Sequence, residues 1–168
     1  MKTWRLLAWG AGVLGLLAGM LAAVNLKKTQ APDVYAWTFQ TPEGQKASLA
    51  KWRGKVLVIN FWASWCEPCA REIPHLIALT KKTAKDQIAV IGIAIDDPEK
   101  ALAFARDHGV NYPILIGKAE AMESSRLLGN AAQGLPFTAV LGPEGQIRAN
   151  HAGEMDEAGL RAFLAPFL

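Results

Sequence analysis

The sequence predicts an α/β domain built from a central β-sheet with helices on either side. Two short runs, Val56–Trp62 and Ile88–Ile95, are almost entirely apolar and rich in β-branched residues, as expected for buried central strands. After the first run, apolar residues recur at helical spacing from about Glu67 onward. After the second run, Asp97 and Pro98 form a helix start with an N-cap and a proline in the first turn. This alternation of strands and helices is typical of an α/β fold.

Turn and cap signals define the elements on either side of these two strands. The N-terminal part predicts a hairpin in which Tyr35–Gln40 and Lys46–Ser48 are joined by a turn at Thr41–Gly44, followed by a helical turn over Ser48–Trp52. The C-terminal part predicts a helix ended by Gly109, a strand over Tyr112–Ile116, a helix over Ala119–Leu128, a hairpin of Phe137–Leu141 with Gln146–Asn150, and a final helix over Asp156–Phe163.

The two cysteines of the chain, Cys66 and Cys69, lie where the first buried strand gives way to the helix. At a helix N-terminus, free backbone N–H groups and the helix dipole favour the thiolate of Cys66. Pro68 suits the first turn, because no N–H partner is needed there. The two sulfurs can meet across one helical turn, so the pattern predicts thiol–disulfide exchange. A purely structural disulfide is the alternative, although so small a loop gains little chain entropy from it.

The segment FWASWCEPCAREIP, residues 61–74, resembles the active site of thioredoxin-fold proteins. Cys-x-x-Cys followed by x-x-Glu-x-Pro resembles more narrowly the TlpA/ResA-like family of membrane-tethered thiol–disulfide reductases. A second match is Gly134–Thr138, in which Pro136 occupies the place of the fold's cis-proline. The resemblance runs from about Pro32 to the C-terminus. It implies a thioredoxin-like fold with a central mixed β-sheet flanked by helices, here with an N-terminal β-hairpin extension.

The resemblance also implies roles for the residues of the motif. Cys66 is the expected nucleophile, and Cys69 is the expected resolving cysteine. Glu72 lies three residues beyond Cys69, on nearly the same helix face, and is the candidate acid/base group. Asn60 stands where ordinary thioredoxins carry a buried aspartate for this proton transfer. The alternative for Glu72 is a solvated carboxylate near the helix start.

Glu67 and Pro68, between the cysteines, are expected to tune the redox potential. A carboxylate beside Cys66 disfavours the thiolate, which keeps the thiol pKa nearer neutral and makes the dithiol a good electron donor.

Trp65, Leu135 and Pro136 are predicted to form the substrate groove. A cis bond before Pro136 would expose the backbone of Leu135 to an extended client segment. A trans proline that opens an edge strand is the alternative. Trp65 is expected to shield Cys66 at the surface.

Residues 1–28 are predicted to form a transmembrane signal-anchor, residues 29–34 a tether, and residues 35–168 the thioredoxin-like domain. Leu6–Val24 contains no charged or strongly polar residue and exceeds the roughly 7–15 apolar residues of a cleaved signal peptide. A cleaved signal peptide remains the alternative. This segment is followed by a redox domain. Together they predict a single-pass protein of the inner (cytoplasmic) membrane whose C-terminal domain lies in the periplasm.

These features indicate which partners and cofactors to expect. The partners are client proteins with disulfides or thiols, such as apocytochromes c, and a membrane electron-relay reductant. Beyond the redox-active disulfide we expect no cofactor and no metal. The net charge of +3 comes from the N-terminal segment, which holds four Lys and Arg residues and no acid, so a nucleic-acid partner is not expected.

Two other functional classes use related folds. A copper-delivery module would need the two thiolates and a third ligand such as His151. A peroxiredoxin-like peroxidase would need the pattern Pro-x-x-x-Thr-x-x-Cys, and the residues before Cys66 supply neither the proline nor the threonine.

Overall fold

The computed structural model describes residues 32–82 and 87–167. The elements, with η denoting a short 3₁₀ helix, are η1 (Val34–Ala36), β1 (Thr38–Gln40), β2 (Lys46–Ser48), η2 (Leu49–Trp52), β3 (Val56–Trp62), α2 (Glu67–Lys82), β4 (Ile88–Ile95), α3 (Pro98–Asp107), β5 (Ile114–Gly117), α4 (Ala119–Leu127), β6 (Phe137–Leu141), β7 (Ile147–Ala152), α5 (Glu157–Leu164) and η3 (Ala165–Phe167). The predicted anchor over residues 1–28 lies outside the described residues. Within the described ranges, no helix is long and apolar enough to cross a bilayer.

The described strands build a seven-stranded mixed sheet in the order β2-β1-β5-β4-β3-β6-β7. The central strands β3, β4 and β5 are parallel, and the strands on both flanks are antiparallel to their neighbours. The hairpin of β1 and β2 joins the sheet beside β5. The predicted thioredoxin-like mixed sheet and the β-hairpin extension are therefore both confirmed.

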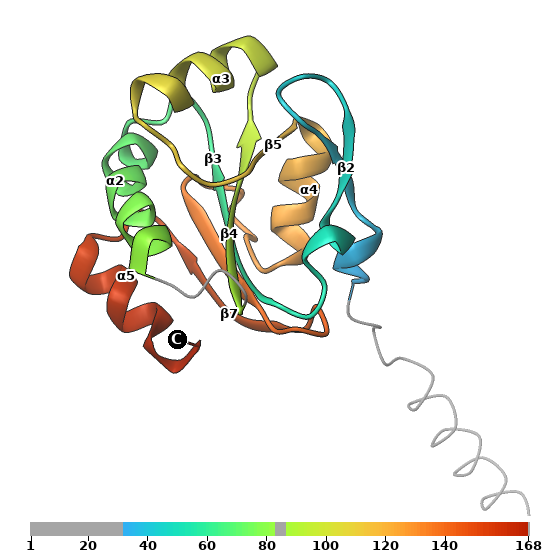
Figure 1. The fold of residues 1–168 in the computed structure, drawn as a ribbon, viewed down its shortest axis with the longest axis vertical. Helices are drawn as coiled ribbons and strands as arrows, with labels where there is room; N and C mark the ends of the chain where they lie inside the picture. Colours follow the sequence, from blue (N-terminus) through green and yellow to red (C-terminus); the bar gives the residue numbers. More distant parts are fainter. Residues whose placement is uncertain (1–31, 83–86, 168) are drawn as a thin grey trace, which may run out of the picture. The chain divides into compact units, whose positions relative to one another are not determined.

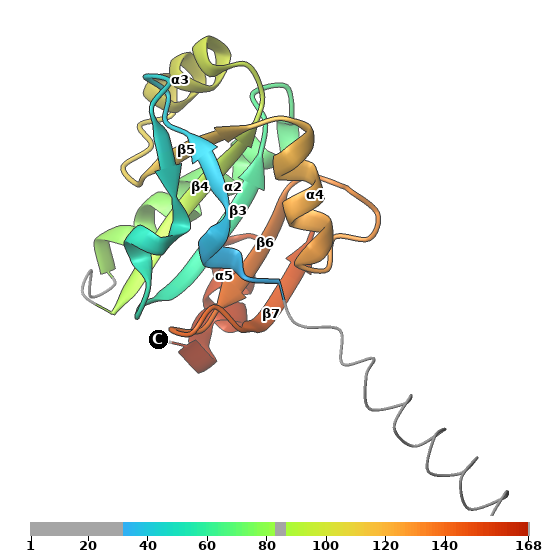
Figure 2. The same ribbon diagram turned by 90° about the vertical axis from the view of Figure 1, so that its right-hand side faces the viewer.

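Helices cover the two faces of this sheet. Figures 1 and 2 show α2 and α5 on one face of the sheet and α4 on the other. The helix α3 lies at one end of the sheet, at the top of Figure 1. Successive residues of β3 point to opposite faces. Val58 packs with Leu76 and Leu160 below α2 and α5, whereas Ile59 packs with Leu128 behind α4.

The same alternation places a row of unusual residues beneath α2. Asn60 of β3 pairs with Gly92 of β4 on one side and with Thr138 of β6 on the other. Trp62, two residues beyond Asn60, also points to this face, where it clusters with Ile73 of α2. The polar side chain of Asn60 and the glycine at position 92 interrupt the apolar centre of the sheet. They mark the part of the core that lies below the cysteines.

The predicted strand over Tyr35–Gln40 is wrong in its first half, because Val34–Ala36 forms the 3₁₀ helix η1. Asp33 Oδ1 accepts the backbone N–H of Tyr35 at 3.2 Å, and the Tyr35 hydroxyl donates to the carbonyl of Pro143 at 2.8 Å. These contacts turn the chain before β1 begins. The other predicted elements are confirmed with small shifts at their ends.

Candidate active site

The turn between β3 and α2 carries Cys66 to the helix N-terminus, where it forms a disulfide with Cys69. The backbone N–H of Cys69 donates to Sγ of Cys66 over an N···S distance of 3.3 Å. The carbonyl of Cys66 accepts the N–H of Ala70 at 3.2 Å, so Cys66 is the N-cap of α2. Cys66 is 6% exposed and Cys69 is 1% exposed. Cys66, whose sulfur receives the helix N–H, is therefore also the more exposed of the two residues.

A buried carboxylate holds the turn that precedes Cys66. Asp96, directly after β4, accepts the backbone N–H of Ser64 at 2.7 Å and that of Asp97 at 2.8 Å. Its side chain is only 8% exposed. The sequence analysis missed this contact, although an acidic residue directly after a buried parallel strand was a signal for it.

Glu72 is buried against the sheet and is 1% exposed, so the alternative of a solvated carboxylate is wrong. Its Oε2 accepts a hydrogen bond from Nδ2 of Asn60 at 2.8 Å, and its Oε1 accepts the backbone N–H of Met155 at 3.1 Å. The Asn60 amide also donates to Oγ1 of Thr138 at 2.9 Å. One carboxyl group thus connects α2 to the sheet and to the loop between β7 and α5.

Burial is the main cause that raises the pKa of Glu72 from 4.5 to about 7. The N–H groups of Met155 and Asn60 act in the opposite direction, because they stabilise the carboxylate, and the negative charge of Glu154 raises the pKa again. A carboxyl group with a pKa near 7 can both take up and release a proton at neutral pH. It lies one helical turn beyond Cys69, on the buried face that both residues share.

The carboxylate of Glu67 is exposed and paired with a cation. Nη1 of Arg71 lies 3.0 Å from Oε1 of Glu67, and Nη2 of Arg71 lies 2.6 Å from Oε2 of Glu154. Arg71 therefore bridges two carboxylates at the start of α2 and offsets part of the charge that the sequence assigned to Glu67. The sequence could not reveal this bridge, because Glu154 lies far along the chain.

The loop before β6 brings the second predicted motif to the cysteines. The Leu135–Pro136 peptide bond is cis, so the trans alternative is wrong. Leu135 packs against the cluster that contains both cysteines. Asn130, which the sequence analysis overlooked, holds this loop: its Nδ2 donates to the carbonyl of Gly134 at 2.9 Å, and its Oδ1 accepts the N–H of Gly134 at 3.1 Å.

Trp65 is 69% exposed, beside Cys66 in the chain. It borders an open pocket of about 430 Å³, whose other lining residues are Ile95, Asp96, Asp97, Lys100, Lys118, Ala119 and Met122. Trp65 thus joins the redox turn to a hollow that both apolar and charged side chains line.

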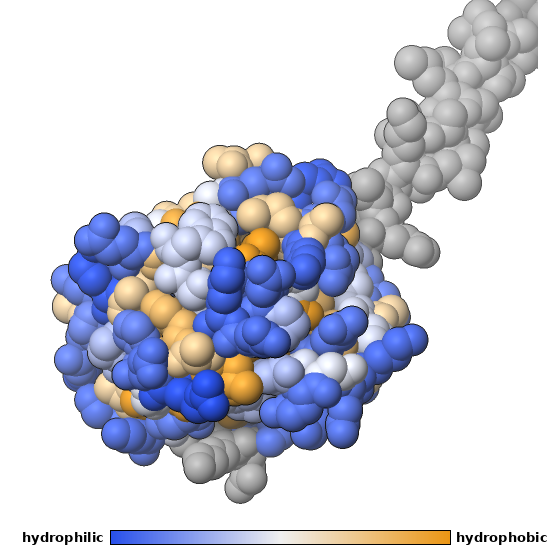
Figure 3. Space-filling model, turned by 90° about the horizontal axis from the view of Figure 1, so that it is seen from above, coloured by the Kyte–Doolittle hydropathy of each residue, from blue (hydrophilic) through white to orange (hydrophobic). Residues whose placement is uncertain are grey.

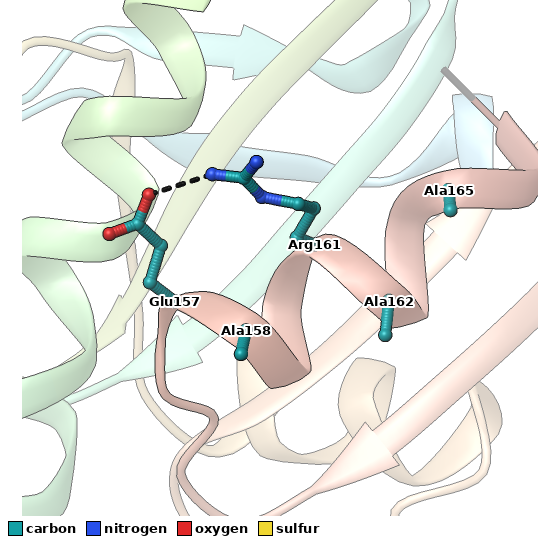
Figure 4. Close-up of a pocket in the computed structure, with 5 residues that line it drawn as sticks. All are labelled: Glu157, Ala158, Arg161, Ala162 and Ala165. Atoms are coloured by element: carbon teal, nitrogen blue, oxygen red, sulfur yellow. Dashed lines mark hydrogen bonds and ion pairs between the residues drawn. The ribbon is translucent and has the colours of Figure 1, made fainter.

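Another hollow, of about 570 Å³, runs along the outer side of α5 (Figure 4) and is lined by Glu157, Ala158, Arg161, Ala162 and Ala165. Its two charged residues form an ion pair at 3.0 Å, and it contains no thiol, so it is not a candidate for the redox site. Among the described residues, no group of three or more His, Cys, Asp or Glu side chains is placed to hold a metal ion. His151, the third copper ligand considered above, lies with its ring 6.0 Å from the ring of Phe163.

Residues 28–150 match the AhpC/TSA family. Thioredoxin-like protein YneN of Bacillus subtilis (strain 168) is 32% identical over 163 residues, which span 88% of this chain and 91% of that protein. Thiol-disulfide oxidoreductase ResA of Bacillus thuringiensis (strain Al Hakam) is 27% identical over 124 residues, 73% of this chain and 69% of that protein. The crystal structure of a thioredoxin-related protein from Neisseria meningitidis serogroup B superposes with a TM-score of 0.68 at 28% identity, covering 77% of this chain and 97% of that chain.

We predict that the oxidised protein loses stability as the pH rises from 4.5 to about 7, and that Glu72→Gln removes this loss. The folded protein raises the pKa of Glu72 above its ordinary value of 4.5. The resulting stabilisation is therefore complete below pH 4.5 and disappears as the carboxyl ionises near pH 7. Its size is on the order of 3 kcal/mol. Denaturant unfolding across a pH series measures this loss.

Glu123→Gln is the matched control, because Glu123 is an exposed carboxylate paired with Arg126 on α4. The control should keep the loss of stability between these pH values. An equal loss in Glu72→Gln would contradict the assignment to Glu72.

Proposed function

Because this chain belongs to the AhpC/TSA family, as a TlpA/ResA-like thiol–disulfide oxidoreductase of the thioredoxin superfamily, we propose that it reduces disulfides of client proteins at the periplasmic side of the inner membrane. One observation carries the proposal. Cys66, the more exposed of the two cysteines, accepts a helix N–H on its sulfur, and a buried carboxyl group lies one turn beyond Cys69. This arrangement supplies a nucleophile, a resolving thiol and a proton acceptor within one helix.

The reaction begins with the reduced pair. The Cys66 thiolate attacks one sulfur of the client disulfide, and the other client sulfur leaves as a thiolate. Cys69 then gives its proton to the Glu72 carboxylate and attacks Sγ of Cys66. The client's second sulfur leaves, so the client gains two electrons and the Cys66–Cys69 disulfide forms. No bound cofactor takes part, because the cysteine pair itself carries both electrons.

We assign client binding to the surface that flanks Cys66. Leu135, against the cysteine cluster, and the neighbouring Pro136 would contact the client backbone, while Trp65 and the hollow behind it would receive a side chain. Figure 3 looks onto the side of the molecule on which α3 lies in Figure 1, and it shows small apolar areas (orange) among hydrophilic residues (blue). A surface of this mixed kind suits transient contact with proteins.

The charges near the pair support the direction of electron flow. Arg71 carries one positive charge between the carboxylates of Glu67 and Glu154, so an excess negative charge remains at the start of α2. Negative charge near Cys66 disfavours its thiolate, which favours the disulfide and makes the dithiol a donor.

The periplasmic location rests on the sequence of residues 1–28. An oxidoreductase outside the cytoplasm needs a reductant that carries electrons across the membrane, so a membrane electron-relay protein completes the cycle. Apocytochromes c are one class of client, since their haem-attachment cysteines must be reduced. No observation favours the copper module or the peroxidase over this function.

If Cys66 is the nucleophile, Cys69→Ala should hold a client as a mixed disulfide on Cys66, because the resolving thiol is gone. Non-reducing electrophoresis of cells expressing the variant detects the adduct, which a reductant should dissolve. Cys66→Ala is the control and should accumulate no adduct. Equal trapping by both variants would contradict the assignment.

We predict that the midpoint potential of the pair lies nearer roughly −270 mV than the roughly −120 mV of strong oxidants. Equilibration against a series of glutathione buffers measures it. Glu67→Gln should shift the midpoint upward, because it removes negative charge near the thiolate, whereas Glu123→Gln on α4 should leave it unchanged. A midpoint more positive than about −170 mV would reverse the proposed direction.

The full-length chain should fractionate with membranes and retain an N-terminus at or near Met1, because Leu6–Val24 is an apolar stretch long enough to anchor it. Cell fractionation with N-terminal sequencing checks this. A chain that lacks residues 1–31 should be soluble. If expression of the full-length chain gives a soluble protein that begins near residue 24, the segment is cleaved.

A further inference from the structure

Two polar atoms in the described core have no hydrogen-bond partner, namely Nε1 of Trp62 and the hydroxyl oxygen of Tyr112. Trp62 is fully buried and Tyr112 is 7% exposed. Burying such a group without a partner costs about 1–3 kcal/mol. Where no protein group is in reach, an ordered internal water commonly satisfies buried polar groups of this kind.

Both groups lie over Gly92 of β4. A Cβ atom on Gly92 would stand 2.8 Å from Nε1 of Trp62 and 3.1 Å from Cε2 of Tyr112, so the absence of a side chain makes room for them. Gly92 pairs with Asn60 on the adjacent strand, about 4.8 Å away, and the Asn60 amide donates to Glu72. The two unpartnered groups therefore lie over the strand next to the one whose Asn60 binds the Glu72 carboxyl.

The packing of Tyr112 is consistent with this position. Its ring belongs to the cluster beneath α2 that includes Leu76, one turn beyond Glu72. Burial raises the pKa of Tyr112, and the negative charge of Glu72 raises it further, as expected for groups that face the same part of the core. The Tyr112 hydroxyl thus stays protonated and remains a hydrogen-bond donor at neutral pH.

We propose that Tyr112 is a positioning residue for proton transfer at Glu72, in which its hydroxyl and the indole N–H of Trp62 hold one internal water that donates a hydrogen bond to the Glu72 carboxylate. The water accepts one hydrogen bond from each donor and gives one to Glu72. This adds a third donor to those from Asn60 and Met155 and favours the ionised carboxylate. The effect of Tyr112 on the reaction rests on the proposed acid/base role of Glu72. The effect of Tyr112 on the pKa of Glu72 does not depend on that role.

Few other charged or titratable groups face Glu72. The loop between β7 and α5 contributes Glu154, whose charge Arg71 of α2 partly offsets. The same helix contributes Cys69, which is disulfide-bonded and does not titrate in the oxidised protein. Asn60 and Thr138 from the sheet are neutral. A measurement on the oxidised protein therefore isolates the Glu72 carboxyl from the thiols.

Tyr112→Phe tests the proposal, because it removes only the unpartnered hydroxyl and keeps the ring in the core. We expect it to raise the pKa of Glu72 by about one pH unit, the effect of losing a hydrogen bond to a charged group. Carbon-13 NMR of the glutamate side-chain carboxyls in the oxidised full-length chain measures this, with Glu72→Gln to assign the signal. Tyr35→Phe is the matched control, since that hydroxyl donates to Pro143 in another part of the fold.

An unchanged Glu72 titration in folded Tyr112→Phe, or an equal shift in Tyr35→Phe, would overturn the proposal. The pH profile of insulin-disulfide reduction should move upward with the Glu72 titration in Tyr112→Phe, which a purely structural role of the ring would not cause. If Glu72→Gln leaves that profile unchanged, the acid/base role in the proposed function fails. The NMR titration would still decide the role of Tyr112.

Discussion

The burial of one carboxyl group beneath the redox helix is the constraint on which the site depends. Glu72 accepts hydrogen bonds from Asn60 on β3 and from the backbone of Met155 before α5. These bonds fix α2 relative to the sheet and to α5, and α2 in turn carries Cys66 at its N-cap. Because ionising a buried carboxyl is costly, burial raises the pKa of Glu72 to about 7, although the hydrogen bonds that orient the helix act in the opposite direction.

Opposing electrostatic effects meet at Cys66. The N–H of Cys69 and the helix dipole stabilise a thiolate there, whereas the carboxylates of Glu67 and Glu154 disfavour it. Arg71, bound to both carboxylates, reduces their effect because its charge lies between them. The reactivity of the pair thus reflects a balance of nearby charges and helix N–H groups, and no single residue between the cysteines sets it.

The loops on either side of the disulfide are held by buried polar side chains. Asp96 fixes the backbone of Ser64 before Cys66, and Asn130 fixes Gly134 before Leu135. Each of these bonds satisfies backbone groups that no strand or helix pairs, which would otherwise be costly to bury. Hydrogen bonds therefore hold the backbone on both sides of the sulfurs, and Trp65 is the large side chain beside them that remains exposed.

The sequence by itself determined the α/β class, the central strands, the start of α2 near Glu67 and the N-cap position of Cys66, because these follow from local periodicity and capping. Only the tertiary structure decided that Glu72 is buried, since Met155, whose N–H it accepts, lies 83 residues further along the chain. The bridge from Arg71 to Glu154, also 83 residues away, and the space that Gly92 leaves for Tyr112 likewise arise where distant segments pack. The spacing of residues along the chain does not predict such contacts, because burial and charge pairing arise only when distant segments fold together.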